Sequence, residues 1–348
     1  MNLVRHLIWV FIGTCCAAQT VTTNPASVIQ VFPSNSRPAT ATVSITGIGS
    51  VTINAATASG GNWLSVTPAT GTLPLTATIT MDPTGLPDGT YLGSVAANAG
   101  TIPVTILVGS PGPQLPPNGI VNAASYQGGA ISPGEIVALF GTNIGPQIPY
   151  SAQVWDGVMM TRLAGTRVWI GNTPAPVIYA YPNQLAVVVP YEIAGQASVQ
   201  VQVENLVART PAFSVPVQSA TPGFFTANSS GIGQLAALNQ DGSVNSASNP
   251  ADQGSVVSLY ATGMGALNPT VPDGTIISSS TLPALASPVR VTIGGATAQV
   301  LYAGPAPGLV AGAIQINVMV PSGITGNVAA VATVGTLSSP GGCTISVR

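Results

Sequence analysis

The sequence predicts an all-β fold, and three observations support that prediction. Val, Thr, Ser and Ala are abundant between frequent Gly and Pro residues, and Val and Thr suit a pleated sheet. Turn-forming residues recur about every ten positions, which is the spacing typical of sandwiches built from short strands. No stretch shows the long 3.6-residue apolar period of an amphipathic helix. We therefore expect tandem immunoglobulin-like β-sandwich domains.

Composition narrows the classes of function that the chain can serve. With 348 residues it can form two or three domains, each with a core of its own. Apolar residues make up 46 %, which is too many for a disordered chain, and charged residues make up only 5 %. Lys is absent, and a formal net charge of -2 supplies no basic stripe for phosphate backbones. We expect no nucleic-acid partner.

The N-terminus has the layout of a secretory signal peptide. A basic residue, Arg5, precedes the apolar stretch 7–13, and the small residues at 16–18 resemble a cleavage site. Strand-like polar sequence begins directly afterwards. We therefore expect a signal peptide over residues 1–18 and a protein that is secreted or held in the cell envelope.

Two cysteines at the end of this segment suggest a second mode of export. Lipoprotein anchoring at Cys15 or Cys16 is the less favoured alternative, because Thr14 is a poor residue before a lipidated Cys. No later segment reaches the ~18 uninterrupted apolar residues of a membrane span. The sequence therefore predicts no membrane-spanning segment in the exported chain.

Cleavage after residue 18 would leave little reactive chemistry. The single His is His6, and Cys343 would be the one remaining Cys, so no disulfide within the chain is expected. A serine hydrolase needs a His or Lys base, and neither would remain. Gly-x-Ser-x-Gly and GxxxxGK[ST] motifs are absent as well. We expect no enzyme activity and no cofactor, and we interpret Cys343 as a buried strand thiol.

Carboxylates are the remaining candidates for catalysis or metal binding. Two of them could serve a glycosidase, but most lie in turn contexts such as Pro87-Asp88-Gly89. Asn239, Asp241, Ser243 and Asn245 alternate in the manner of oxygen ligands for calcium. A hairpin with Asp-Gly at its tip explains the same residues, and the segment lacks the Glu of an EF-hand loop. We favour the hairpin and expect no metal site.

An internal repeat is the clearest sign of domain organisation. Four blocks recur in the same order: residues 134–142 and 254–262, 167–171 and 290–294, 177–180 and 300–303, and 184–190 and 315–321. A period of about 120 residues corresponds to a whole domain rather than to a solenoid unit. We expect one immunoglobulin-like copy at residues 118–216 and a second at 217–348.

A separate domain is expected ahead of the repeat, at residues 19–110. Its strands are predicted to include residues 41–45, 75–81 and 102–108. A Pro-rich segment at 111–117 follows, and its stiffness makes it a natural linker.

Two motifs in the first domain point to a known family. Residues 62–68 (NWLSVTP) and 85–91 (GLPDGTY) resemble the BACON family. Its members are immunoglobulin-like modules, common at the N-terminus of bacterial extracellular proteins and proposed to bind carbohydrate. The resemblance is stronger support for the fold than for a ligand, because any sandwich core can contain a ring such as Trp63.

Motifs in the rest of the chain point to a second family. These motifs are residues 119–126, 132–137, 239–245, 301–308 and 315–317, and together they resemble the Solibacter-type C-terminal domain family. That family recurs in secreted acidobacterial proteins and has no established activity, so the resemblance implies a secreted protein without implying a reaction. The segment 149–160 departs from the family pattern.

The repeat helps to separate framework rings from surface rings. Phe140 aligns with Tyr260 and Tyr179 with Tyr302, so we interpret these four rings as framework positions. No aromatic residue of the second copy aligns with Tyr150, Trp155, Tyr181 or Tyr191 of the middle domain.

Five residues of the middle domain are candidates for a ligand-binding face. Trp169 aligns with Thr292, and strand alternation turns Val168 and Ile170 inward, which leaves Trp169 outward. The candidate residues are Trp169, Trp155, Arg167, Tyr181 and Tyr191. The alternative is that these rings are buried in a contact between domains.

These observations favour a non-catalytic exported protein that acts as an extracellular adhesion, scaffold or surface-interaction module. A carbohydrate-binding protein that uses exposed aromatics of the middle domain is the alternative, because rings beside polar groups suit sugar recognition. The expected partner is a polysaccharide or another surface protein. Low charge and β-sheet edges leave self-association open, and the sequence does not predict an oligomeric state.

Overall fold

The computed structural model describes residues 21–33, 36–98, 100–109, 112–278 and 282–348. The chain divides into two compact units, of which the first ends at Ser110 and the second begins at Pro111. The predicted signal peptide, including Cys15 and Cys16, lies outside the described residues.

Regular structure in the described part of the chain is almost entirely strand. The exceptions are two short 3-10 turns, η1 (Pro117–Gly119) and η2 (Tyr191–Ile193). None of the helical segments among the described residues is long and apolar enough to cross a bilayer. The prediction of an all-β fold is confirmed.

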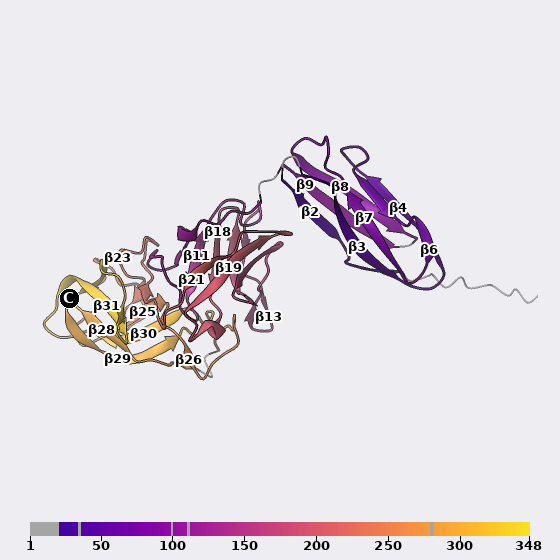
Figure 1. The fold of residues 1–348 in the computed structure, drawn as a ribbon. Helices are drawn as coiled ribbons and strands as arrows, with labels where there is room; N and C mark the ends of the chain where they lie inside the picture. Colours follow the sequence, from indigo (N-terminus) through magenta and orange to yellow (C-terminus); the bar gives the residue numbers. More distant parts are fainter. Residues whose placement is uncertain (1–20, 34–35, 99, 110–111, 279–281) are drawn as a thin grey trace, which may run out of the picture. The chain divides into compact units, whose positions relative to one another are not determined.

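The first unit is a two-sheet immunoglobulin-like sandwich. Its strands are β1 (Thr22–Asn24), β2 (Val28–Phe32), β3 (Ala39–Thr46), β4 (Ser50–Thr57), β5 (Leu64–Thr67), β6 (Thr70–Thr72), β7 (Leu75–Met81), β8 (Gly89–Ala97) and β9 (Gly100–Val108). One sheet has the order β1-β3-β7-β5 and the other the order β2-β9-β8-β4-β6 (Figure 1). The first sheet corresponds to strands A, B, E and D of an immunoglobulin domain. In the second sheet, β4, β8 and β9 correspond to strands C, F and G.

Two aromatic residues of the first unit have structural roles. Trp63 is 3 % exposed in the core, and its Nε1 donates a hydrogen bond to Ser59 O (2.8 Å). The Tyr91 hydroxyl donates to Pro87 O (2.8 Å) near the start of β8, the position of the tyrosine corner in immunoglobulin sandwiches. Sandwich geometry therefore accounts for both motifs that resemble the BACON family.

The second unit holds both repeats, residues 118–216 (first repeat) and 217–348 (second repeat). The first repeat has β10 (Ile120–Asn122), β11 (Ile136–Phe140), β12 (Tyr150–Ser151), β13 (Val154–Trp155), β14 (Val158–Met159), β15 (Thr166–Ile170), β16 (Thr173–Pro174), β17 (Val177–Tyr181), β18 (Gln184–Val188), β19 (Ser198–Asn205), β20 (Ala208–Arg209) and β21 (Phe213–Pro216). The second repeat has β22 (Gly223–Phe224), β23 (Gly233–Gln234), β24 (Ala237–Leu238), β25 (Val256–Thr262), β26 (Leu267–Asn268), β27 (Ala284–Leu285), β28 (Val289–Ile293), β29 (Ala296–Pro305), β30 (Ile314–Met319), β31 (Gly326–Val334), β32 (Leu337–Ser338) and β33 (Cys343–Val347). Cys343 is a buried free thiol on the last strand, as predicted.

The two repeats share strand order and register. The first pairs β10-β11-β18-β17 in one sheet and β16-β15-β19 in the other, with β21 on β19. The second pairs β22-β25-β30-β29-β28-β31-β33 in the equivalent order. The register skips one residue between Val177 and Tyr179, and it skips again at the aligned pair, Val300 and Tyr302. The sequence repeat therefore extends to a shared irregularity of the backbone.

One strand differs between the copies. In the second repeat β29 is continuous and pairs with both β28 and β30, so that it joins the two sheets. In the first repeat the equivalent strand is split into β16 and β17 around Ala175. Pro174 and Pro176 flank the break, and Pro cannot donate a hydrogen bond to a ladder.

An apolar seam joins the repeats within the second unit. Met159 and Val188 of the first repeat pack with Val310 and Ala313 of the second. Leu115, in the segment 111–117 predicted as a Pro-rich linker, belongs to the core of the first repeat.

Candidate functional site

Tyr191 does not face solvent, contrary to the prediction of a ligand contact. It is 8 % exposed and packs against Leu267 and Ala311 of the second repeat. Its hydroxyl donates to Ala311 O (3.1 Å), and its backbone N–H donates to Asp273 Oδ1 (2.9 Å). Burial raises the pKa of the phenol. Tyr191 is therefore part of the contact between the repeats, which was the alternative considered for these rings.

Trp155 stands at the tip of the hairpin β13–β14. Asp156 and Gly157 form its turn with positive φ values of 49° and 75°, a conformation that an Asp-Gly pair adopts readily. The indole is 78 % exposed. Among the described residues it makes no ring contact with the other candidates.

Trp169 and Arg167 lie on the outer face of β15, as strand alternation predicts. Val168, which lies between them, and Ile170, which follows Trp169, are buried in the core. The Trp169 indole is half-buried, with the guanidinium groups of Arg167 and Arg209 each 5.1 Å from its centroid. The indole is thus engaged by side chains of its own sheet and is not an open platform.

Tyr181 belongs to an aromatic surface on the other sheet of the first repeat. Its ring is 37 % exposed and stacks on Tyr179, with the centroids 4.9 Å apart and the planes at 21°. Gln184 lies directly opposite Tyr181 on one side and Phe140 on the other. The Gln184 Nε2 donates to the Tyr179 hydroxyl (2.7 Å). Rings and an amide are therefore held together on three neighbouring strands.

A hollow adjoins this stack. Its volume is about 250 Å³, and its lining combines the two repeats: Ala123, Ala124, Tyr126, Ile136, Ile178, Tyr179, Ala186, Phe225, Thr226 and Ser229. Tyr126 and Phe140 are each 38 % exposed. We call Tyr126, Phe140, Tyr179, Tyr181 and Gln184 together the tyrosine face.

The tyrosine face carries no formal charge. Neither its five residues nor the lining of the hollow includes Asp, Glu, Arg or His. Burial raises the pKa of Tyr179, so its phenol stays neutral at ordinary pH. The face therefore offers flat apolar rings with hydroxyl and amide groups at their edges.

The second repeat lacks the equivalent ring stack. Gly304 occupies the position of Tyr181, and Tyr302 occupies that of Tyr179. The Tyr302 hydroxyl donates to the backbone at Pro305 (2.7 Å). The stack is therefore a property of the first repeat alone.

Sequence reasoning missed most of the tyrosine face because it assigned Phe140 and Tyr179 to the framework. Both positions are aromatic in each copy, yet Phe140 is exposed and Tyr179 is half-buried. The available signal was that Tyr179 and Tyr181 stand two residues apart, which places both on one face of a strand. Tyr126 lies in a loop, where no periodicity could have identified it.

Glu135 is a fully buried carboxyl group at the connection between the repeats. Its Oε2 accepts hydrogen bonds from the Ser132 N–H (2.8 Å) and the Thr221 hydroxyl (2.7 Å), and its Oε1 accepts one from Asn122 Nδ2 (2.8 Å). Burial raises its pKa to about 7 in spite of these donors. Because the exposed fraction of Glu135 is 0 %, a ligand cannot reach it, and we interpret it as part of the contact between the repeats.

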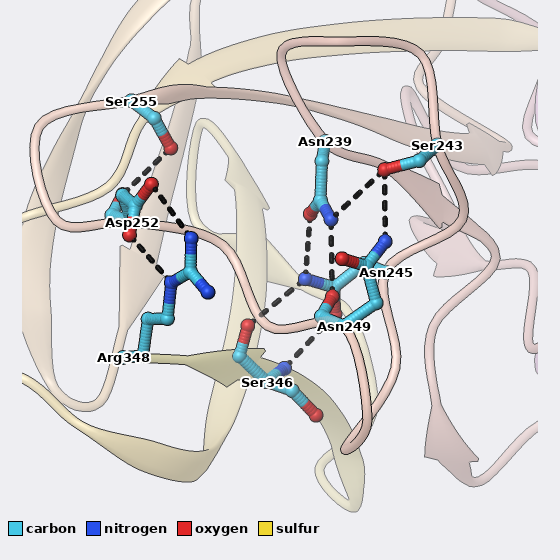
Figure 2. Close-up of polar contacts among 8 residues, drawn as sticks. All are labelled: Asn239, Ser243, Asn245, Asn249, Asp252, Ser255, Ser346 and Arg348. Atoms are coloured by element: carbon cyan, nitrogen blue, oxygen red, sulfur yellow. Dashed lines mark hydrogen bonds and ion pairs between the residues drawn. The ribbon is translucent and has the colours of Figure 1, made fainter.

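Two further carboxylates, Asp241 and Asp252, line one open groove of about 510 Å³. Arg348 forms an ion pair with Asp252 (2.7 Å), as Figure 2 shows, and this holds the pKa of that carboxyl below its usual value. The Ser243 hydroxyl (2.6 Å) lowers the pKa of Asp241 in the same way. A glycosidase acid needs a raised pKa, so this pair does not supply one.

The segment considered for calcium is a turn fastened to the last strand (Figure 2). The backbone N–H of Asn239 donates to Ser243 O (2.8 Å) and closes the turn. Asn245 is buried, and its Nδ2 donates to Asn239 Oδ1 and Ser346 O (both 2.9 Å). Asn239 Oδ1 and Ser346 O therefore already accept hydrogen bonds from within the chain, which supports the hairpin interpretation. The described ranges contain no group of three or more His, Cys, Asp or Glu residues able to hold a metal.

Comparison with known proteins bears on the first unit. Residues 20–109 match the viral BACON domain family, so this part of the chain is BACON-like. No curated protein matches the chain. Because the match covers the first unit alone, it leaves the repeats unassigned.

Solved structures resemble the chain at low identity. Domains 4 and 5 of the S-layer protein SbsC are 14 % identical, covering 26 % of this chain and 51 % of that one, with a TM-score of 0.21. The SGBP-B protein of a mixed-linkage glucan utilisation locus of Bacteroides ovatus is 12 % identical, covering 93 % and 66 %, with a TM-score of 0.30. The I9–I11 tandem of titin is 9 % identical, covering 94 % and 99 %, with a TM-score of 0.19. The chain spans about half the length of the S-layer fragment, and the fold assignment depends on the strand order described above.

Proposed function

We propose that the protein is a non-catalytic, exported binding module that holds an uncharged saccharide chain on the tyrosine face. The observation that carries this proposal is the Tyr179–Tyr181 stack, which is partly exposed and bordered by Gln184. Apolar faces of sugar rings pack on flat aromatic surfaces, and their hydroxyl groups need nearby donors and acceptors. The tyrosine face supplies both without any charge.

The carboxyl groups support a binding role rather than a catalytic one. Glu135 has the raised pKa of a general acid but no exposure, whereas Asp241 and Asp252 are exposed but have lowered pKa values. Asp273 is half-buried, and its pKa is raised by burial and, to a smaller extent, by the Glu192 carboxylate, but its Oδ1 accepts the Tyr191 N–H (2.9 Å) in the contact between the repeats. A chain cleaved after residue 18 would also lack His and Lys.

The proposal places this face within a wider role as an extracellular adhesion or surface-interaction module. Export is supported by the N-terminal pattern of the first 18 residues. The motifs at residues 119–126 and 132–137 support membership of residues 118–348 in the Solibacter-type family. These motifs contain Asn122 and Glu135, which are hydrogen-bonded to each other at the contact between the repeats.

Replacing Tyr181 by Ala tests the proposal. Uncharged polysaccharides, such as mixed-linkage glucan and xyloglucan, would be screened against residues 19–348 by affinity electrophoresis and titration calorimetry. We expect saturable binding that Tyr181→Ala weakens roughly 3- to 10-fold, which corresponds to about 0.5–1.5 kcal/mol for one ring contact.

Tyr302→Ala is the control, because Tyr302 is the second repeat's counterpart of Tyr179, the stacking partner of Tyr181, and it lies where no stack exists. It should leave affinity unchanged, and circular dichroism should show both variants folded. Absence of binding to every uncharged glycan, or equal weakening by both substitutions, would show that the tyrosine face is not a saccharide site.

A further inference from the structure

A row of charged side chains crosses the other sheet of the first repeat, on its outer face. Arg167 on β15 lies directly opposite Glu204 on β19, and Glu204 lies directly opposite Arg209 on β20. Arg209 pairs with Glu204 through Nε (2.9 Å) and a terminal nitrogen (2.7 Å). Arg162 approaches the second carboxylate oxygen of Glu204 at 4.0 Å.

The row has more positive than negative charge. Three arginines face one glutamate, so the formal sum is +3 − 1 = +2. None of the strands of this sheet (β15, β16, β19, β20 and β21) contributes another Asp or Glu. A local excess of this size is unusual in a chain whose charged residues amount to 5 %.

Arg167 is the cation without an acidic partner. Glu204 is already bonded to Arg209 and accepts a third contact from Trp169 Nε1 (3.3 Å). Among the residues that the structure describes, the Arg167 side chain forms no hydrogen bond or ion pair, and its Nε is buried without a partner. The guanidinium carbon lies 5.1 Å from the centroid of the Trp169 ring, and a ring contact of this kind limits the motion of the side chain while its nitrogens stay unpaired among the described residues.

We propose that these residues bind a carboxylate or sulfate group of an acidic polysaccharide. We call Arg162, Arg167, Trp169, Glu204 and Arg209 the arginine face. A guanidinium plane matches the two oxygens of such a group, and charge-assisted hydrogen bonds are the stronger kind. This site lies on a different sheet from the tyrosine face, so the two proposals stand or fall separately.

Neighbouring side chains favour a saccharide over other polyanions. Gln200 and Gln202 precede Glu204 on the same face of β19. Gln202 Nε2 donates to Thr210 O (3.1 Å), and its Oε1 and the Gln200 amide can bind sugar hydroxyl groups. Three arginines are too few for the phosphate contacts with which proteins hold nucleic acid. An acidic peptide would present carboxylates without the hydroxyl groups that the two amides suit.

The second repeat provides a natural control for this site. Arg290 occupies the position of Arg167, but Thr292 replaces Trp169, and the residue opposite Arg290 is Thr333 rather than an acid. Arg290 is exposed and lies in the same register of the same kind of strand. It therefore has the charge of Arg167 without the surrounding ring and charged row.

The test compares Arg167→Gln with Arg290→Gln in residues 19–348. Titration calorimetry would use polygalacturonate for carboxylates, dextran sulfate for sulfates, and uncharged dextran. We expect binding to at least one acidic polymer and none to dextran. Arg167→Gln should weaken that binding at least 10-fold, Arg167→Lys should weaken it less, and Arg290→Gln should leave it unchanged. Raising the salt concentration should weaken wild-type binding, because exposed charges are screened.

Several results would overturn the proposal. Equal losses in the Arg167 and Arg290 variants would indicate a diffuse charge effect rather than a site. A further outcome is competition by free sulfate or acetate when its concentration equals that of the polymer's sulfate or carboxylate groups. Such competition would show that the site binds small anions rather than a polysaccharide. Binding of polyglutamate as tight as that of the acidic polysaccharides would assign the face to acidic peptides. If none of these polyanions binds, the charged row has only a structural role in the sheet, and the proposal is wrong.

Discussion

Tyr126 combines an exposed ring with an unfavourable backbone conformation. Its φ is 58°, in the left-handed region that bulky residues rarely adopt, and its N–H donates to Asn122 O (2.9 Å). Asn122 also holds the preceding turn, because its Oδ1 accepts the N–H groups of Ala124 and Ser125. Strain that surrounding bonds impose on an exposed ring is typical of ligand sites. We therefore expect the ring to contribute to saccharide binding.

Substitutions of Tyr126 separate the strain from the ring. Tyr126→Gly and Tyr126→Ala should weaken glycan binding equally, since both remove the ring. Gly should leave the protein more stable than Ala by about 1 kcal/mol, because only Ala keeps the left-handed penalty. Urea denaturation and calorimetry measure the two effects. Equal stabilities would show that the backbone at this position is not strained.

At the scale of single residues, the sequence predicted orientation better than burial. Strand alternation correctly placed Trp169 and Arg167 outward, because side-chain period depends on the strand alone. It could not show that Tyr191 is buried, since the covering residue, Ala311, lies 120 positions away. The same limit hid the guanidinium group of Arg209, which lies 40 positions from Trp169 in the sequence.

Among the elements, the turn before β11 controls how the repeats meet. Gly134 has a φ of 70°, and a Cβ at this position would overlap the Tyr191 ring. Gly254 is its counterpart in the second repeat, with a φ of 76° and open space where a Cβ would be. One glycine is thus required by both backbone and packing, and the other by backbone alone.

This pair of glycines allows a matched test of the seam. Gly254→Ala should cost about 1–2 kcal/mol of stability from the left-handed backbone. Gly134→Ala should cost about 1–3 kcal/mol more, because Tyr191 must move out of the contact between the repeats. Thermal unfolding of the two variants measures the difference. If the costs are equal, the seam at Tyr191 adapts without loss, and its role in joining the repeats is smaller than the structure indicates.

The elements themselves were largely predictable where the sequence repeats. Paired blocks at 134–142 and 254–262 became β11 and β25 in the same register, because equal patterns bury equal faces. The hairpin β13–β14 departs from that pattern, and its partner is the backbone of Gly274 in the other repeat. A contact between a unique hairpin and a distant loop has no signature in either segment.

For the second unit as a whole, Glu135 makes stability depend on pH. Its pKa is about 7 in the folded state and near 4.5 in an unfolded chain, so the folded state binds the proton more tightly. Its contribution to the free energy of unfolding is therefore complete below about pH 4.5. That contribution disappears as the pH rises through about 7, a loss on the order of 3 kcal/mol.

Glu135→Gln should remove this part of the pH dependence. We expect the urea midpoint of the wild-type unit to fall between pH 4.5 and 7.5, and the variant to show a flatter profile. The exposed carboxylate Asp156 at the tip of hairpin β13–β14 provides a control, because Asp156→Asn should keep the wild-type slope. A slope that survives in Glu135→Gln would assign the pH dependence to other groups, such as Asp273, whose pKa is also raised by burial.

On the largest scale, the sequence predicted three sandwiches, whereas two of them share one compact unit. The reason is the apolar seam, in which Met159 packs with Val310. Each of these residues also reads as an ordinary core residue of its own domain, so hydrophobic pattern could not assign it to a contact between domains. Strand order within each sandwich was predictable because it depends on local alternation and turn chemistry.

The parallel pairing of β2 with β9 in the first unit has a mechanical consequence. Five residue pairs, from Val28 with Val104 to Phe32 with Val108, connect β2, which follows the three-residue strand β1, with β9, the last strand of this unit. A pull applied to the chain on either side of the unit acts along these parallel strands in opposite directions. The hydrogen bonds between them are then loaded together in shear, and they cannot open one after another as a hairpin does when it is unzipped. An exported protein that is tethered at one end and holds a polymer at the other would meet tension with its first unit in this resistant geometry.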